Sequence, residues 1–237
     1  MLDQINLSNV LFLDIETVPQ TATFAQLNPT FQELWEHKSK YFRKEDQSPE
    51  ECYERAGIFA EFGKVICISI GKITEDQEGG KTLKMKSFYG FDEAVLLNDF
   101  AQVLEKLKSD TLLCAHNGRE FDFPYLSRRM LINAIKLPKV LDNSGKKPWE
   151  INHLDTLELW KFGDHKHYTS LNLLAAVFNI PTPKDDINGS QVASVYWKDK
   201  DVERIKTYCE KDVLTLVQLV LRFKGLPLIT DEQIVRV

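Results

Sequence analysis

The amino-acid sequence predicts an α/β fold in which a mixed β-sheet is flanked by helices. Three observations lead to this prediction. Short apolar and β-branched runs in the first ninety residues have the composition of a β-meander. Strand-like and helix-like segments then alternate. The chain continues with a long amphipathic segment at 201–223. Strands interleaved with helices favour a sheet covered by helices over an all-β or all-α architecture.

The bulk composition suits one globular unit. The chain has 237 residues, of which 43% are hydrophobic and 27% charged. We expect a single domain over 1–237 with an insertion at about 17–63. The net charge of −5 argues against a protein that coats nucleic acid by bulk electrostatics. It does not exclude a nuclease, because metal-binding carboxylates contribute to that charge.

Cellular location and thiol chemistry follow from what the sequence contains. It has no long uncharged apolar run, and its start lacks the basic and apolar regions of a secretory signal, so we expect a cytoplasmic protein with no membrane partner. The four cysteines form no CxxC pair, which argues against a zinc site. We interpret three of them, which lie in apolar or helical runs, as ordinary buried thiols, and this cysteine usage fits a reducing compartment.

The first half of the chain contains three expected strands and one irregular stretch. Residues 10–14 form an apolar run that ends in an acid, and 64–72 is β-branched and apolar. Gly79-Gly80 marks a turn, after which 81–89 is expected to be the returning strand. The polar stretch 17–63 is expected to contain helices. One of these should open at Ser48, where Ser-Pro-Glu-Glu resembles a capping box with proline at the first helical position.

The second half is expected to alternate helices with short strands. Asp92 should cap a helix whose inner face is apolar. The remaining elements are a strand at 111–115, a helix at 121–131, short helices at 171–178 and 190–196, and a final helix at 201–223.

Asp14 and Glu16 end the first expected strand. Alternation along a strand places residues i and i+2 on the same side, so both carboxylates can point at one ion. Oxygen ligands of this kind suit a hard divalent cation such as Mg²⁺ or Mn²⁺. The end of an apolar strand is also where α/β sheets place their ligand sites. The alternative is an acidic turn without a metal.

A second group of polar residues joins the strand at 111–115 to the helix that follows. Asp122 stands at the expected start of this helix, where an aspartate is often only an N-terminal cap. Asn117 and Gly118 could simply form the turn, and Phe121 could belong to the core.

Tyr208 and Asp212 form the third group. Residues i and i+4 share one face of a helix, so the phenol and the carboxylate converge. Apolar residues follow Asp212 directly, which predicts that this part of the helix is buried. A buried carboxylate is costly without a partner or a metal, and this favours a site over an exposed acid.

Together the three groups resemble the exonuclease motifs of the DEDD superfamily. DIET, then Asn-x-x-x-Phe-Asp, then Tyr-x-x-x-Asp occur in that order, and Tyr208 matches the DEDDy branch. The histidine branch would require His at position 207, which is Thr207 here. More narrowly, DIETVP, HNGREFDFPYLSRR, SLNLLAAVFNIP and YCEKDVLTL resemble predicted 3′–5′ exonucleases related to the proofreading domain of family-B DNA polymerases. The likeness extends over residues 10–223.

This resemblance implies a ribonuclease H-like fold with a five-stranded mixed sheet and two Mg²⁺ or Mn²⁺ ions as cofactors. Asp14 is expected to bridge the ions, Glu16 and Asp212 to hold the first, and Asp122 to hold the second through water. Tyr208 is expected to position the attacking water. A tyrosine, with its reference pKa of about 10, would orient this water rather than deprotonate it. The four crowded carboxylates should repel one another without cations.

Other residues have less specific assignments, some of them from the same resemblance. Thr17, Val18, Asn117 and Phe121 are expected to contact the terminal nucleotide. Asp155, at an expected strand end, should have a structural hydrogen-bonding role. Arg128 and Arg129 are expected to be solvated at the surface, with phosphate contact as the alternative. His165 and His167 are interpreted as part of a surface or substrate-side loop.

The expected function is a 3′–5′ exonuclease whose partner is nucleic acid with a free 3′ end, single-stranded DNA in preference to RNA. Two other functions stay open: a catalytically silent nucleic-acid-binding or adaptor module, and an exoribonuclease or short-oligonucleotide phosphodiesterase. The presence of all four acids and the tyrosine argues against the first. The missing histidine variant argues against the second. A polymerase or repair factor could be a partner in trans.

Overall fold

A central strand organises the molecule, and the computed structural model describes residues 2–164, 168–181 and 187–237. β1 (Val10–Pro19) pairs in antiparallel register with β2 and in parallel register with β4. Within the described residues the sheet has six strands in the order β5-β4-β1-β2-β3-β6. The other strands are β2 (Gly63–Glu75), β3 (Lys81–Tyr89), β4 (Leu112–Ala115), β5 (Leu154–Asp155) and β6 (Ile234–Arg236).

This topology confirms the predicted fold class, a mixed sheet flanked by helices, but the predicted strand count was wrong. β6 is the additional strand, and it pairs in parallel with Leu83, Lys84 and Met85 of β3. It has only three residues, and Val235 is exposed. A strand this short has no hydrophobic alternation to detect, because its pairing comes from the fold and not from its own sequence.

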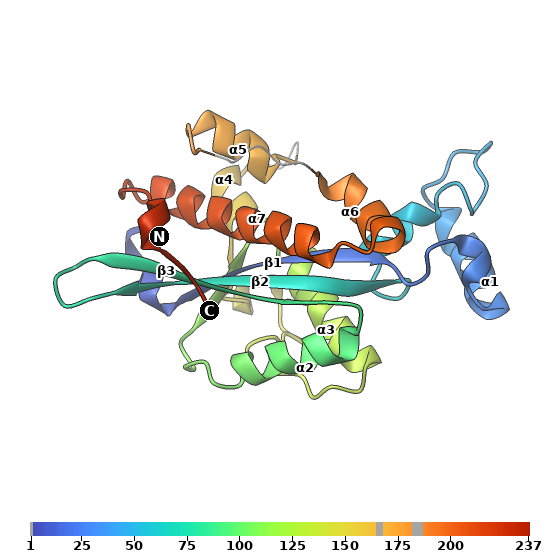
Figure 1. Cartoon of the computed structure of the whole chain (residues 1–237), viewed down its shortest axis with the longest axis horizontal. Coiled ribbons are helices and arrows are strands. Elements are labelled where there is room, and N and C mark those ends of the chain that lie inside the picture. Colours follow the sequence, from blue (N-terminus) through green and yellow to red (C-terminus); the bar gives the residue numbers. More distant parts are fainter. Residues whose placement is uncertain (1, 165–167, 182–186) are drawn as a thin grey trace.

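Helices cover both faces of the sheet (Figure 1). The long helix α7 lies against β1 and β2 on one face, with α4 and α5 on the same side, and α2 and α3 cover the opposite face. Their bounds are α2 (Glu93–Leu104), α3 (Asp122–Ile132), α4 (Thr156–Lys161), α5 (Leu171–Val177), α6 (Val192–Ser194) and α7 (Val202–Phe223). The five residues Val195–Asp199 form a turn of π-helix before α7. Within the described residues, no helix has the length and apolar character needed to cross a bilayer.

Alternation along β1 divides the core into two layers. Leu11, Leu13 and Ile15 belong to the layer packed on α2 and α3. Val10 and Phe12 belong to the layer packed on α7. The next two residues that share the orientation of Val10 and Phe12 are Asp14 and Glu16. The strand that fills the core on the α7 side therefore delivers two acids to that same side as it ends.

The segment between β1 and β2 forms an aromatic projection at one end of the sheet (Figure 1). It contains α1 (Pro29–Ser39) and the 3-10 helix η4 (Tyr53–Ile58), packed around the fully buried Trp35. The helix expected to open at Ser48 was wrong. The Ser48–Glu51 capping hydrogen bonds form, but only turns follow before η4 begins. Capping bonds satisfy the amides of a single turn and do not extend a helix on their own.

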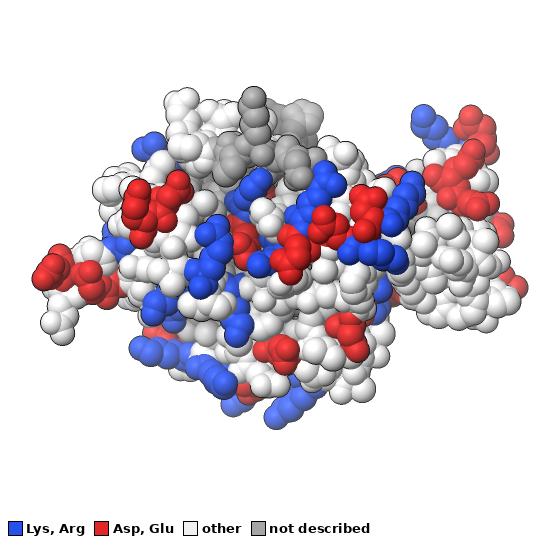
Figure 2. All heavy atoms as spheres, viewed as in Figure 1, with Lys and Arg blue, Asp and Glu red and all other residues white. Residues whose placement is uncertain are grey.

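Charges of both signs are distributed over the visible face of α7 (Figure 2). Acidic and basic side chains are interspersed along this helix and do not gather into one field. Interspersed charges largely cancel at a distance beyond the Debye length, which is about 8 Å at physiological salt. Recognition of a charged polymer would therefore depend on local contacts near a site.

Candidate active site

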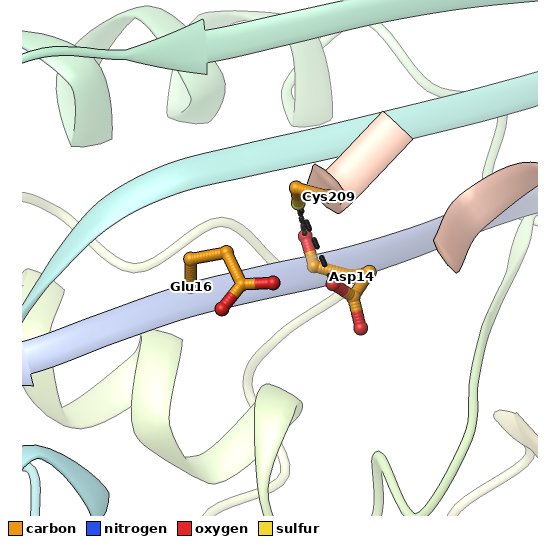
Figure 3. Close-up of side chains that lie close together, drawn as sticks. All are labelled: Asp14, Glu16 and Cys209. Carbon is orange, nitrogen blue, oxygen red and sulfur yellow. Dashed lines mark hydrogen bonds between the residues drawn. The ribbon is translucent and has the colours of Figure 1, made fainter. Parts of the chain in front are cut away.

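The two acids of β1 lie side by side on the strand and face α7 (Figure 3). Their side chains follow the strand alternation that the sequence predicts. Glu16 is buried and Asp14 half-buried. Directly after Glu16 the pairing of β1 with β2 shifts, because Glu16 pairs with Cys67 whereas Thr17 pairs with Val65. Irregularities of this kind bend a strand and change the direction of its side chains, and they are common beside active sites.

Cys209 of α7 completes a tight group with these acids. One ligand atom each of Asp14, Glu16 and Cys209 lies within 4.8 Å of the others. The thiol donates weak hydrogen bonds to the Asp14 main-chain carbonyl and to its Oδ2, both at 3.4 Å (Figure 3). The interpretation of Cys209 as an ordinary buried thiol missed this contact. Its position four residues after the buried Ile205 places it on the sheet-facing side of α7, and this periodicity was the available signal.

Asp122 is the first residue of α3 and is almost fully buried. Burial is the main cause that raises the pKa of its carboxyl to about 7, and backbone hydrogen bonds of Asp122 and Ile15 partly oppose the rise. The bond with Ile15 places this carboxyl beside the residue that separates Asp14 from Glu16. The aspartate is therefore more than a helix cap, because it faces β1.

Tyr208 and Asp212 lie one turn apart on α7, and both are half-buried. The phenol is hydrogen-bonded to the Asp212 carboxylate. Burial and the negative charge of Asp212, followed by those of Glu16 and Asp14, raise the pKa of Tyr208 far above its usual range. The phenol therefore keeps its proton at neutral pH and can donate it in a hydrogen bond.

The carboxylates of the site lie close enough to repel one another. Burial raises the pKa of Asp14 well above its usual range, and the charges of the three other predicted acids raise it further. Glu16 behaves in the same way, with burial first and Asp212 second. Each acid is thus held near others of the same sign in a poorly hydrated place, which is unfavourable unless a proton or a cation compensates.

This donor set fits hard divalent cations. Carboxylate oxygens are the preferred ligands of Mg²⁺ and Mn²⁺, and a cation removes the repulsion that raises these pKa values. The sulfur of Cys209 is a softer donor, but its hydrogen bonds to Asp14 keep it in a supporting position. Asp14, Glu16, Asp122 and Asp212 are therefore the residues that could hold metal.

Asp155 organises the loop that precedes α3. Its Oδ1 accepts hydrogen bonds from the backbone amides of Asn117 (2.9 Å) and Leu157 (2.9 Å), and its Oδ2 accepts one from Arg119 (3.0 Å). Its carboxylate is thus committed to backbone donors, and the expected structural role is confirmed. Asn117 itself has a φ of 62°, a left-handed conformation that asparagine tolerates in turns.

The four expected substrate contacts separate into two groups. Thr17 and Phe121 line a pocket of about 490 Å³ together with Glu16, whereas Val18 and Asn117 do not line it. The Val18 side chain is fully buried, so only its backbone can meet a ligand. Val18 comes after the register shift, and strand alternation alone could not predict which way it would point.

Two further expectations concern basic and histidine residues. Arg128 is exposed, as expected, but Arg129 is buried and forms an ion pair with Glu93, so its expected place at the surface was wrong. Helical rotation separates adjacent residues by about 100°, which turns Arg129 inward. His165 and His167 lie outside the described residues.

Comparisons with known proteins identify the family of this chain. A family described as a predicted 3′–5′ exonuclease related to the exonuclease domain of PolB matches residues 58–232, about three quarters of the chain. The match includes Asp122, Tyr208 and Asp212. Asp14 and Glu16 precede it in sequence and join it through the pairing of β1 with β2.

The curated relatives are larger proteins. A DNA polymerase of Pyrococcus glycovorans is 24% identical over 189 residues, which is 72% of this chain and 23% of the relative. DNA polymerase 1 of Pyrococcus abyssi is 26% identical over 180 residues, 67% of this chain and 22% of the relative. The chain thus spans less than a quarter of the length of these relatives.

Solved structures give weaker likenesses. The family B DNA polymerase of Pyrobaculum calidifontis has a TM-score of 0.49 and 17% identity, covering 90% of this chain and 24% of the polymerase. E. coli Exonuclease I in complex with a dT13 oligonucleotide has a TM-score of 0.40 and 12% identity, covering 91% of this chain and 42% of that one. The family assignment rests on the sequence match: the chain belongs to the predicted 3′–5′ exonucleases related to the exonuclease domain of PolB.

Proposed function

We propose that this chain is a DEDDy-type 3′–5′ exonuclease that hydrolyses phosphodiester bonds from the 3′ end of single-stranded DNA. The observation that carries the proposal is the group of adjacent carboxylates at the end of β1, in which the charges of three other acids act on Asp14. Such a group is unfavourable in the folded protein unless it serves to bind cations. Membership of an exonuclease family supports the reaction class.

Each acid has a role in the proposed mechanism. Asp14, Glu16, Asp122 and Asp212 would together hold the divalent cations, with Asp14 shared between the ions, Glu16 and Asp212 serving the first and Asp122 the second. When bound, two divalent cations stabilise charge on the attacking and leaving oxygens of an in-line displacement. The protein's own contribution is to fix these carboxylates on β1, α3 and α7, so that little reorganisation is needed when substrate binds.

Tyr208 acts as a hydrogen-bonding group in this proposal. Its raised pKa keeps the phenol protonated, so it is a poor general base at neutral pH. Its bond to Asp212 orients the ring toward the acids. The phenol then positions the attacking water, and Asp212 determines where the phenol points.

DNA is the proposed polymer because the curated relatives are DNA polymerases. A site that accepts a chain terminus requires a free end. We therefore propose single-stranded or frayed DNA 3′ ends as substrates, with one nucleotide released at a time.

The test is a time course on 5′-labelled single-stranded DNA and RNA with Mg²⁺ or Mn²⁺. We expect a ladder on DNA that EDTA abolishes and that Asp14→Ala reduces to background. Asp99→Ala is the matched control, because Asp99 is an exposed acid of α2 on the opposite face of the sheet. Intact DNA and RNA with both metals would overturn the proposal. Equal loss of activity in Asp99→Ala would also count against it.

A further inference from the structure

The pocket beside Glu16 has a wall that comes from the aromatic projection. One side is formed by residues of β1 and by Phe121, which precedes α3. The 3-10 helix η4 contributes Glu54, Arg55, Gly57 and Ile58 to the lining, and Gly189, Ser190 and Ala193 complete it. The volume of about 490 Å³ lies within the range of small-ligand sites. A segment inserted between two strands thus meets an acid of the candidate active site across one cavity.

Hydrogen bonds fix this wall to the site. Tyr125 of α3 donates its hydroxyl hydrogen bond to the Gly57 carbonyl at 2.8 Å, and the same hydroxyl is hydrogen-bonded to Thr17. A side chain at Gly57 would come within 3.1 Å of the Val18 backbone carbon. Glycine at this position therefore allows the close approach of η4 to β1, and a shift of the wall would break the buried hydrogen bond to Tyr125.

A buried ion pair secures the end of the projection where the chain returns to the sheet. Arg129 donates to the Ala60 carbonyl at 2.9 Å and to the carboxylate of Glu93, which also accepts from the Val65 amide at 2.7 Å. Residues 57–65 are thus held at three points against α2, α3 and β1. A segment anchored in this way offers a preformed surface to a ligand.

Two exposed side chains of this wall stand out chemically. The Arg55 guanidinium lies 4.5 Å above the Phe42 ring, and Phe42 is stacked on Phe59 at 5.5 Å. Among the described residues the guanidinium has no hydrogen-bond or ion-pair partner, so its donors are available. Ile58 is 51% exposed although it is a large apolar residue. The lining of the pocket thus includes a cationic side chain, Arg55, and the apolar side chains of Ile58 and Phe121.

We propose that Arg55 and Ile58 bind the 3′-terminal nucleoside of the substrate, with Ile58 and Phe121 against the base and Arg55 donating to its polar edge. This inference rests on the proposed function. A nucleobase needs apolar contact on its faces and hydrogen bonds at its edge, and a guanidinium held by an aromatic ring supplies oriented donors. A base seated in this pocket cannot pair with a complementary strand, so the wall selects unpaired 3′ ends.

The test compares Arg55→Gln with Lys38→Gln. Lys38 is the matched control, because its ammonium lies 4.9 Å above Phe59 in the same aromatic stack but does not line the pocket. We expect Arg55→Gln to raise the KM for single-stranded DNA about tenfold, with most of the effect on KM and little on kcat. Arg55→Lys should recover only part of the loss, because it restores charge without the planar fork. Lys38→Gln should match wild type.

A binding measurement separates this inference from the proposed function. In the Asp14→Ala background, fluorescence anisotropy with a labelled dT oligonucleotide should show about tenfold weaker binding for Arg55→Gln. Ile58→Ser should weaken binding too, and should relax the preference for single-stranded over blunt duplex ends. Thermal unfolding checks that each variant folds.

The outcomes are distinct. If wild type cleaves DNA from the 3′ end but Arg55→Gln and Ile58→Ser bind and cleave as Lys38→Gln does, the wall has no binding role and this inference fails alone. If the wild-type protein degrades no nucleic acid, the proposed function and this inference both fail. An Arg55→Gln variant that loses kcat with unchanged KM and unchanged binding would likewise contradict a ground-state binding role.

Discussion

Asp122 illustrates how the demands of folding and of chemistry oppose each other at a single residue. Its carboxyl is almost fully buried, and burial raises its pKa to about 7, so that it loses its proton about three pH units later than an ordinary aspartate does. An acid whose folded-state pKa is raised contributes stability that is complete below the unfolded pKa and is lost as pH rises through the folded pKa. For Asp122 this window extends from about pH 4 to about pH 7.

We therefore predict that the metal-free protein becomes less stable between about pH 4 and about pH 7, and that Asp122→Asn reduces this slope. At pH 8 the substitution should raise the free energy of unfolding by about 2 kcal/mol, and Tm by roughly 4–8 °C, because it removes a buried charge. Thermal unfolding of both proteins in EDTA, at the two ends of this pH range and at pH 8, measures the slope and the difference in stability. An Asp122→Asn variant with the wild-type slope would contradict a destabilising carboxylate.

Tyr208 is the residue at which orientation and base catalysis can be told apart. Its pKa is raised far above its usual range, so no alkaline transition from this phenol should occur in the working pH range. Tyr208→Phe should lower kcat by about 10²-fold, because the water loses its positioning partner. The shape of the pH–rate profile should not change. A basic limb present in wild type and absent in Tyr208→Phe would instead indicate that Tyr208 is a base.

At the scale of elements, the site is assembled from local features that sequence predicts well. The end of β1, the start of α3 and the i,i+4 pair on α7 each follow from short-range periodicity and capping. The contacts that sequence could not predict depend on tertiary packing. Cys209 meets Asp14 only because α7 crosses β1, and the wall formed by η4 exists only because Gly57 packs on Val18.

Arg129 is the clearest case of a tertiary contact that the sequence did not predict. With both partners buried, loss of Arg129 leaves the Glu93 carboxylate without its charge partner. Arg129→Ala should therefore reduce the free energy of unfolding by about 3–5 kcal/mol in urea titrations. Arg128→Ala, at the adjacent exposed position, should change it by less than about 0.5 kcal/mol. Equal effects of the two substitutions would contradict the buried ion pair.

At the scale of the whole molecule, the fold brings acids from three separate parts of the chain to one end of a central strand. Asp14 and Glu16 arrive through β1, Asp122 through α3 and Asp212 through α7. The repulsion among them lowers the free energy of unfolding of the whole domain. Cation binding should relieve it, so metal affinity and global stability are linked.

Metal addition should therefore stabilise the folded chain. At pH 8, Mn²⁺ at about 100 times its dissociation constant should add roughly 2.7 kcal/mol to the free energy of unfolding, detectable as a higher Tm. Asp14→Ala should lose most of this gain, because Asp14 interacts with every other acid of the group. Asp99→Ala should keep it. If Mn²⁺ does not change the Tm of the wild-type protein, a metal site at these carboxylates is contradicted.

The most direct test of the central claim uses two end-blocked oligonucleotides of the same single-stranded DNA sequence, one blocked at its 5′ end and the other carrying an inverted 3′-terminal nucleotide. With Mg²⁺ or Mn²⁺, the 5′-blocked strand should be shortened stepwise from its 3′ end, and the 3′-blocked strand should stay intact. Degradation of the 3′-blocked strand, or cleavage of neither strand, would contradict a 3′–5′ exonuclease built on Asp14, Glu16, Asp122, Tyr208 and Asp212.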